Sequence, residues 1–206
     1  PVPLLVNPHG GPYGVRDSWG YYSDHQFFAS RGYATIQVNY RGSGGYGRSF
    51  YQAGFKKWGR EMQNDLTDAV KWAVDQGIAD PKRICIYGGS YGGYATMAGM
   101  TFTPELYRCG INIVGVVDIP LLYTSAPAYW KPILERFKVE IGDPEADKQM
   151  LYDASPINFV KNIRAPVFII QGKSDPRVVP KHAEWLRSEM EKHDKPYEWM
   201  MKENEG

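Results

Sequence analysis

Residues Ile84–Tyr94 read ICIYGGSYGGY and contain the pattern Gly-x-Ser-x-Gly, with Ser90 at its centre. An apolar run typical of a strand precedes Ser90, and a helix-compatible run, Tyr94–Thr101, follows it. In that context the pattern predicts a strand-to-helix turn so sharp that the serine is strained, and the flanking glycines remove side chains that would collide. The turn places the Ser90 hydroxyl at a helix N-terminus, where the N–H of Tyr91 can face a developing oxyanion. We therefore interpret Ser90 as a nucleophile rather than as part of a plain glycine-rich turn.

Short apolar runs alternate with helical patterns along the rest of the chain. The expected strands are Leu4–Val6, Ala34–Tyr40, Ile84–Gly88, Ile111–Val117, Val167–Gln171 and Tyr197–Met201. Most of them lack polar alternation, which is typical of strands covered on both faces. One helix has an apolar face that recurs from Leu66 to Val74 and stops at Gly77, and another begins near Pro180. This alternation predicts an α/β fold with a mostly parallel sheet of about six strands and with ligands at the carboxyl ends of the strands.

The size and charge of the chain exclude several classes of function. Its 206 residues fit one domain, 1–206, in which residues 120–156 form a small helical excursion over the sheet. Its 24 basic and 23 acidic residues argue against nucleic acid or an anionic membrane as the main partner. No apolar run approaches the roughly 18 residues that a membrane helix needs. Cys85 and Cys109 lie in strand-like runs and are expected to be small buried hydrophobes, not a disulfide framework.

A second glycine-rich stretch, Asn7–Pro12, directly follows the first expected strand and contains His9, Gly10 and Gly11. Paired glycines let a main-chain N–H approach a substrate closely, so Gly10 and Gly11 are candidates for the second oxyanion donor. A tight turn would have the same letters, and the interpretation depends on the turn at Ser90. We expect His9 to be a packed, hydrogen-bonded loop residue and not the catalytic base.

A candidate acid, Asp175, lies at the tip of the turn that follows the strand Val167–Gln171. In hydrolases with this serine turn the order along the chain is serine, acid and histidine, and the acid orients the imidazole and stabilises its cation. The histidine should follow the last strand, whereas His182 and His193 both precede it and are poorly placed. We therefore expect the chain to end before its catalytic histidine. We also expect truncation at the start, because the chain begins abruptly in an apolar strand.

Four stretches together resemble the catalytic domain of the prolyl oligopeptidase family of serine peptidases, and its acylaminoacyl-peptidase and dipeptidyl-peptidase-like branch in particular. They occur in the family's order and cover nearly the whole chain: Pro8–Pro12, Asn39–Gly47, Gly88–Tyr94 and Asp175–Val179. The resemblance implies an α/β-hydrolase fold, with the catalytic histidine directly after Gly206. It also implies two antiparallel strands and a substrate-screening β-propeller upstream, which we do not expect within these 206 residues.

The resemblance also implies roles for residues around the nucleophile. Arg177 matches a position where some relatives hold a substrate carbonyl. Val178 would line an apolar S1 pocket, which receives the side chain on the acyl side of the scissile bond. Tyr123 and Trp130 resemble the aromatic residues that wall this pocket, although core packing explains them equally well. Arg41, in the glycine-rich loop, is expected to be structural.

The implied chemistry is two-step acyl transfer from a short peptide or acyl-peptide through Ser90, with no metal or cofactor. The histidines and cysteines lack the spacing of zinc ligands, and Arg41–Gly47 lacks the Gly-Lys-Ser/Thr ending of a phosphate loop. Two alternatives stay open: a carboxylesterase, which uses the same triad, and a non-catalytic domain that binds partners through an inactive pocket. A sheet edge exposed by missing strands would favour a homo-oligomer. The sequence does not specify a cytoplasmic, periplasmic or secreted location.

Overall fold

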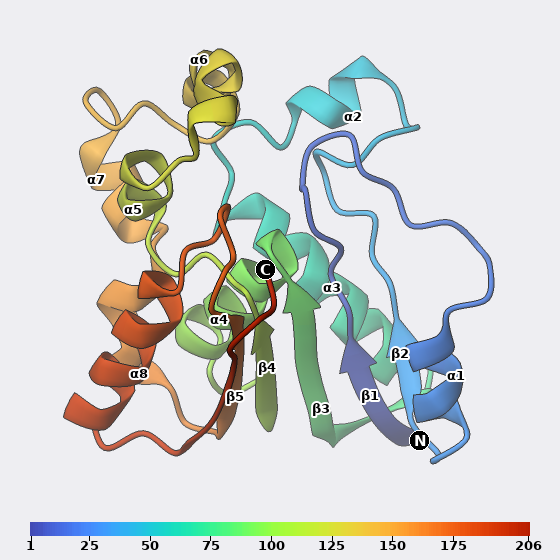
Figure 1. Cartoon of the computed structure of the whole chain (residues 1–206). Helices are drawn as coiled ribbons and strands as arrows, with labels where there is room; N and C mark the ends of the chain where they lie inside the picture. Colours follow the sequence, from blue (N-terminus) through green and yellow to red (C-terminus); the bar gives the residue numbers. More distant parts are fainter.

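The computed structural model describes residues 1–206, which form one sheet of six strands flanked by helices (Figure 1). The strands are β1 (Val2–Val6), β2 (Ala34–Ile36), β3 (Ala79–Gly89), β4 (Cys109–Ile113), β5 (Val167–Gly172) and β6 (Tyr197–Lys202). They lie in the order β2-β1-β3-β4-β5-β6, and every neighbouring pair is parallel. The predicted parallel α/β sheet is confirmed.

Helices cover the sheet and extend beyond the carboxyl ends of its strands. They are α1 (Ser23–Ala29), α2 (Arg48–Gln52), α3 (Glu61–Asp75), α4 (Tyr91–Phe102), α5 (Ile119–Thr124), α6 (Lys131–Glu140), α7 (Lys148–Asp153) and α8 (Lys181–Lys192), with the 3-10 helices η1 (Ala128–Trp130) and η2 (Pro156–Asn162). Figure 1 shows α5, α6 and α7 above the arrowheads of the strands, at the same end of the sheet as the C-terminus. None of the helices is both long and apolar enough to span a membrane.

The two long helices α3 and α4 show how the sequence pattern produces the core. The buried side chains of α3 include Met62, Leu66, Val70 and Ala73, which recur at helical spacing on one face. Helix α4 is buried along nearly its whole length because it packs between β3, β4 and η2, and its residues are accordingly small or apolar on every side. The turn that begins α4 therefore rests on buried elements.

Two strands end earlier than the sequence predicts. β2 stops at Ile36, because Ile36 pairs with Val6, the last residue of its partner strand β1. Beyond this pair β2 has no strand residue to pair with. β4 stops at Ile113, because Val114 has a positive φ of 44° that turns the chain out of the sheet. Val116 and Val117, which extended the predicted strand, are buried in the core without belonging to a strand.

The cysteines correct another prediction. Cys85 on β3 and Cys109 on β4 form a disulfide, whereas the sequence favoured two small buried hydrophobes. They are direct register partners in neighbouring parallel strands, with Cα atoms 4.8 Å apart. A separation of 24 residues along the chain gives no sign of this pairing, because only the register of the strands brings the two side chains together.

Candidate active site

The turn between β3 and α4 presents Ser90 to solvent. β3 ends at Gly89 and α4 begins at Tyr91, so Ser90 alone makes the turn. Its backbone has φ 58° and ψ −117°, a conformation that costs energy in a residue with a side chain. The N–H of Ser90 donates to the carbonyl of Ile113 at 3.0 Å, and its own carbonyl accepts the N–H of Tyr94 at 3.0 Å. Neighbouring elements thus hold the strained turn that the motif predicts.

Gly88 and Gly92 allow this turn, because a side chain would not fit at either position. A Cβ at Gly88 would lie 2.8 Å from the main chain of Gly92. A Cβ at Gly92 would lie 2.3 Å from the carbonyl oxygen of Pro8. The second contact also packs the turn against the loop that follows β1, so both glycines have the steric role that the sequence analysis expected.

The loop Asn7–Pro12 lies against Ser90. A Cβ at Gly10 would lie 3.6 Å from the Cβ of Ser90, and Gly11 lines two cavities together with Ser90. The first N–H groups of a helix have no partner within that helix, which applies to the N–H of Tyr91 at the start of α4. The structure thus gathers the three predicted oxyanion residues around the candidate nucleophile.

His9 is a packed loop residue, as expected. Its Nδ1 lies 2.8 Å from the carbonyl oxygen of Gly10, and its Nε2 lies 2.8 Å from the Oγ of Ser43. Its ring stacks on Tyr40, whose hydroxyl donates to the His9 carbonyl at 2.6 Å. Burial lowers the pKa of His9. Because both ring nitrogens are engaged, His9 is not available to take a proton from Ser90.

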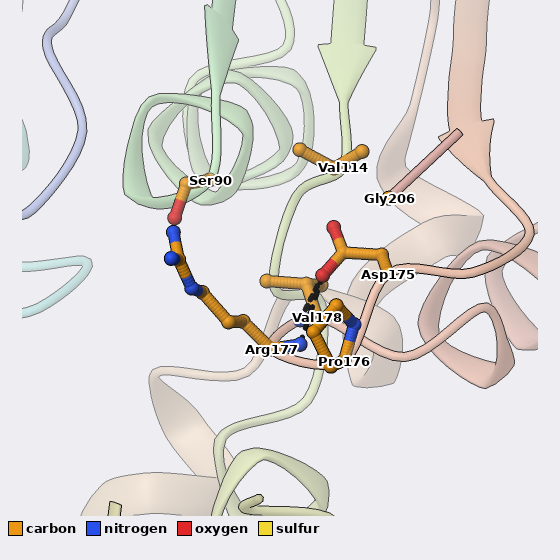
Figure 2. A pocket seen from close by; sticks show the side chains of 7 residues that line it. All are labelled: Ser90, Val114, Asp175, Pro176, Arg177, Val178 and Gly206. Atoms are coloured by element: carbon orange, nitrogen blue, oxygen red, sulfur yellow. Dashed lines mark hydrogen bonds between the residues drawn. The ribbon is translucent and has the colours of Figure 1, made fainter. Parts of the chain in front are cut away.

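The candidate acid faces a cavity of about 390 Å³ that is also lined by the candidate nucleophile. The cavity is lined by Ser90, Val114, Asp175, Pro176, Arg177, Val178 and Gly206 (Figure 2). The Oδ1 of Asp175 accepts the N–H of Arg177 at 2.8 Å and that of Val178 at 3.0 Å. These bonds fix the carboxylate, and Figure 2 shows its other oxygen turned into the space between Ser90 and Gly206.

The last residues of the chain run beside the turn of the acid. The N–H of Ser174 donates to the carbonyl of Glu205 at 2.8 Å. A Cβ at Gly206 would lie 2.9 Å from the carbonyl oxygen of Ser174. Gly206 is therefore part of the wall of the cavity that contains Asp175.

None of the four histidines lines this cavity. His9 is engaged in its loop, His25 lies on α1, and His193 caps the end of α8. His182 is buried, and its Nδ1 accepts the N–H of Val117 at 3.3 Å. The structure therefore places none of the four histidines beside Ser90 and Asp175 in this cavity.

The second cavity beside Ser90, of about 50 Å³, lies beneath the helices above the sheet. It is lined by Gly11, Pro12, Tyr13, Trp58, Ser90, Tyr91, Val116, Leu122, Trp130, Phe137, Ile141 and Val178. Val178 and Trp130, both singled out from the sequence, are among these residues. Tyr123 is not, and its hydroxyl instead donates to the carbonyl of Gly142 at 2.8 Å.

The two arginines singled out from the sequence have different surroundings. Figure 2 shows the side chain of Arg177 reaching from the acid's turn toward Ser90, and both residues line a third cavity together with Trp130. Arg41 makes a bidentate ion pair with Asp65: its Nε lies 2.9 Å from Oδ2 and its Nη2 lies 2.6 Å from Oδ1. Arg41 therefore holds its loop against α3, in agreement with a structural role.

Several residues of the small cavity were missed by the sequence analysis. Phe137 and Ile141 have the i, i+4 spacing of one helix face, and this spacing could have indicated a shared apolar surface. Tyr13 and Trp58 have no comparable signal, because only tertiary packing brings them beside Ser90.

The buried His182 makes stability depend on pH. Burial lowers its pKa from 6.5 to about 4, so the folded state favours the neutral ring. This contribution is complete above pH 6.5 and is lost as the pH falls toward 4, because the unfolded chain then binds a proton that the folded chain does not. At pH 4 the free energy of unfolding should be lower by about 3 kcal/mol from this group alone.

Denaturant titrations between pH 4 and 7 measure this effect. In His182→Asn, whose amide oxygen can accept the N–H of Val117, this part of the pH dependence should disappear. His193→Asn, at the end of the same helix, is the control and should behave as the wild type. Equal pH dependence in the wild type and His182→Asn would contradict a neutral buried imidazole.

Comparisons with known proteins agree with this geometry. Residues 19–206 match the prolyl oligopeptidase family. Dipeptidyl aminopeptidase BIII of Pseudoxanthomonas mexicana is 42% identical over 208 residues, which cover 100% of this chain and 30% of that protein. A puromycin-hydrolyzing peptidase of Mycobacterium tuberculosis has a TM-score of 0.92 at 31% identity, over 100% of this chain and 31% of its own. An acylaminoacyl peptidase in complex with Z-Gly-Gly-Phe-chloromethyl ketone has a TM-score of 0.89 at 27% identity, over 98% of this chain and 32% of its own.

The chain thus spans less than a third of the length of these relatives. Its parallel sheet, its serine turn and these neighbours together identify the α/β-hydrolase fold that the sequence predicted. The family match extends from residue 19 to the last residue and includes both Ser90 and Asp175. The chain therefore belongs to the prolyl oligopeptidase family of peptidases.

Proposed function

We propose that this chain is the nucleophile- and acid-bearing part of a serine peptidase that cleaves short peptides or acyl-peptides. The observation that carries the proposal is the convergence of Ser90, strained at the start of α4, and Asp175 on one cavity. In the first step the Ser90 oxygen attacks the carbonyl carbon, its proton passes to a base, and the amine leaves with that proton. Water then attacks the acyl-enzyme and releases the acid.

The proposed base is a histidine directly after Gly206. Gly206 borders the cavity between the nucleophile and the acid, so the next side chain would begin beside both. Asp175 has one oxygen held by two main-chain N–H groups and the other turned into the cavity. An imidazole there would donate its Nδ1–H to Asp175 and accept the Ser90 proton at Nε2.

The proposed oxyanion site consists of the N–H of Tyr91 and an N–H from Gly10 or Gly11. Its donors belong to a helix N-terminus and to a loop packed against it. Donors already aimed at the developing charge stabilise the transition state more than the ground state. The partial positive charge at the start of α4 acts in the same direction.

We propose that the enzyme prefers an apolar P1 side chain, the substrate side chain on the acyl side of the scissile bond. The small cavity beside Ser90 is mostly apolar, and Val178 and Trp130 form part of its wall. The inhibitor bound by the related acylaminoacyl peptidase has phenylalanine next to its reactive group, which supports this assignment. The exposed guanidinium of Arg177 is placed to hold a second carbonyl of the substrate.

The remaining sequence of the whole protein is proposed to include a β-propeller that screens substrates by size, because the chain spans only 30% of its dipeptidyl aminopeptidase relative. An exopeptidase preference would depend on that domain. A carboxylesterase would use the same Ser90 site, so substrate preference decides between the two activities.

Loss of Ser90 tests the proposal directly. The 206-residue chain should be nearly inert, because removal of one triad member leaves only about 10³- to 10⁴-fold catalysis over water. A chain extended past Gly206 should hydrolyse acyl-aminoacyl, aminoacyl or simple ester chromogenic substrates, and Ser90→Ala should abolish this activity. Ser188→Ala, at an exposed serine of α8, is the control and should retain full activity.

The substrate panel also separates the alternatives. Preference for acyl-aminoacyl or aminoacyl amides supports a peptidase, and preference for simple esters indicates a carboxylesterase. The proposed function would be refuted, and a binding domain favoured, by either of two results. One is that the extended chain hydrolyses none of the substrates, and the other is that Ser90→Ala hydrolyses them as fast as the unsubstituted chain.

Removal of the Arg177 guanidinium tests its contact with a substrate carbonyl. Arg177→Met keeps an unbranched stem but removes the guanidinium, and it should lower kcat/KM for acyl-peptides by about tenfold to a hundredfold, the effect of one hydrogen bond to a charged group. Esters without a second carbonyl should react as before. Lys173→Met, which removes a nearby exposed cation paired with Glu203, is the control. Equal losses on both kinds of substrate would contradict the assigned contact.

A further inference from the structure

Tyr13 directly follows the loop Asn7–Pro12, and its hydroxyl lies between two carbonyl oxygens of other segments. The hydroxyl oxygen is 2.6 Å from the carbonyl oxygen of Glu140 and 2.9 Å from that of Gly54. A phenolic hydroxyl has one hydrogen, so the two acceptors share it. Burial raises the pKa of Tyr13, which keeps this hydrogen in place. Tyr13 thus ties the loop that contains Gly11 to the end of α6.

Glu140 fixes that end of α6 from several sides. Its carbonyl oxygen also accepts the N–H of Lys56 at 2.7 Å. Its carboxylate is almost fully buried and accepts bonds from the hydroxyl of Tyr51 and, at 2.9 Å, from the Nε of Arg136. Hydrogen bonds therefore link the end of α6 to the loop that follows α2.

The same end of α6 is a wall of the apolar cavity. Phe137 and Ile141, which flank Glu140 along the chain, line the cavity together with Tyr13 and Ser90. A side chain that fills the cavity therefore contacts the α6 wall and the ring of Tyr13 at once. Filling the cavity restricts the same residues that hold the oxyanion loop.

We propose that Tyr13 is a positioning residue that couples filling of the apolar cavity by the P1 side chain to the placement of the Gly11 N–H at the oxyanion. This inference rests on the function proposed above. A P1 side chain that orders the α6 wall also orders Glu140, and the shared hydrogen of Tyr13 transmits that order to the loop. Catalytic donors act only when they are held to within about 0.5 Å of the productive geometry. Binding energy gained in the cavity then appears as faster acylation rather than as tighter binding.

The hydroxyl can be removed without leaving a buried group unpaired. Both carbonyl oxygens also accept a main-chain N–H, one from Lys57 at 3.2 Å and the other from Lys56 at 2.7 Å. The ring of Tyr13 packs edge-on against Tyr51 and Phe55, with centroids 6.0 Å and 5.7 Å away. Phenylalanine retains these contacts, so Tyr13→Phe removes the tie and little else.

The test uses the chain extended past Gly206 and acyl-aminoacyl anilides whose P1 residue is glycine, alanine, leucine or phenylalanine. In the wild type kcat should rise from glycine to phenylalanine. In Tyr13→Phe kcat should fall about three- to tenfold for leucine and phenylalanine, the loss expected for one hydrogen bond, and stay unchanged for glycine. KM should not change. Active-site titration normalises each preparation.

Tyr94→Phe is the matched control. It removes a buried hydroxyl that donates to the carbonyl of Ala154 at 2.7 Å, outside the oxyanion loop. It should lower the melting temperature yet keep the wild-type dependence of kcat on P1. A merely structural role of Tyr13 would produce the same result in Tyr13→Phe.

A double-mutant cycle gives a second measurement. In Phe137→Ala, which removes part of the α6 wall, Tyr13→Phe should have little further effect on kcat for the phenylalanine substrate. Additive effects of the two substitutions on kcat would overturn the coupling. For Tyr13→Phe alone, an equal loss of kcat for every P1 residue, a change in KM without a change in kcat, or no change in either would also overturn it. The proposed function itself is refuted if the wild type hydrolyses none of the anilides, or if Ser90→Ala hydrolyses them as fast as the wild type.

Discussion

The close approach of Gly92 to the carbonyl oxygen of Pro8 is the contact on which the site depends. A Cβ at this position would lie 2.3 Å from that oxygen, so only glycine lets the start of α4 pack on the loop after β1. This packing brings two chain segments together, one with the proposed nucleophile and the other with the glycines proposed as oxyanion donors. The strain at Ser90 persists because a hydrogen bond to Ile113 on β4 holds its N–H.

The proposed acid, Asp175, comes to the same place because of the sheet topology. Parallel strands end at one edge of the sheet, so the loops after β3, β4 and β5 meet there although they are far apart in the chain. Ser90 follows β3, Val114 follows β4 and Asp175 follows β5, and all three line one cavity. The helices above the sheet then form an apolar wall next to the nucleophile, with its end fixed by Glu140. A polar centre and an adjacent apolar cavity suit a reaction in which charge develops beside a bound side chain.

The sequence predicted those features that depend on local geometry. The turn at Ser90 needs glycines at fixed offsets, and the alternation of strands and helices requires a parallel sheet, so both were predictable from short stretches. Features that depend on register or on packing between distant segments were not. The disulfide between Cys85 and Cys109 follows from strand register, and the hydrogen bond from Tyr13 to Glu140 joins the segment after β1 to α6. The end of β4 was misplaced, because apolar residues beyond it are buried without being in the sheet.

In the proposed function, Ser90 is activated by Asp175 through a histidine supplied after Gly206. Reaction with diisopropyl fluorophosphate followed by peptide mass mapping tests it most directly, because only an activated serine reacts quickly. We expect a single phosphoryl adduct on Ser90 in the chain extended past Gly206, much slower labelling in the 206-residue chain, and slow labelling in an extended Asp175→Asn variant. Labelling of another serine, or equal rates in all three proteins, would rule out this activation of Ser90.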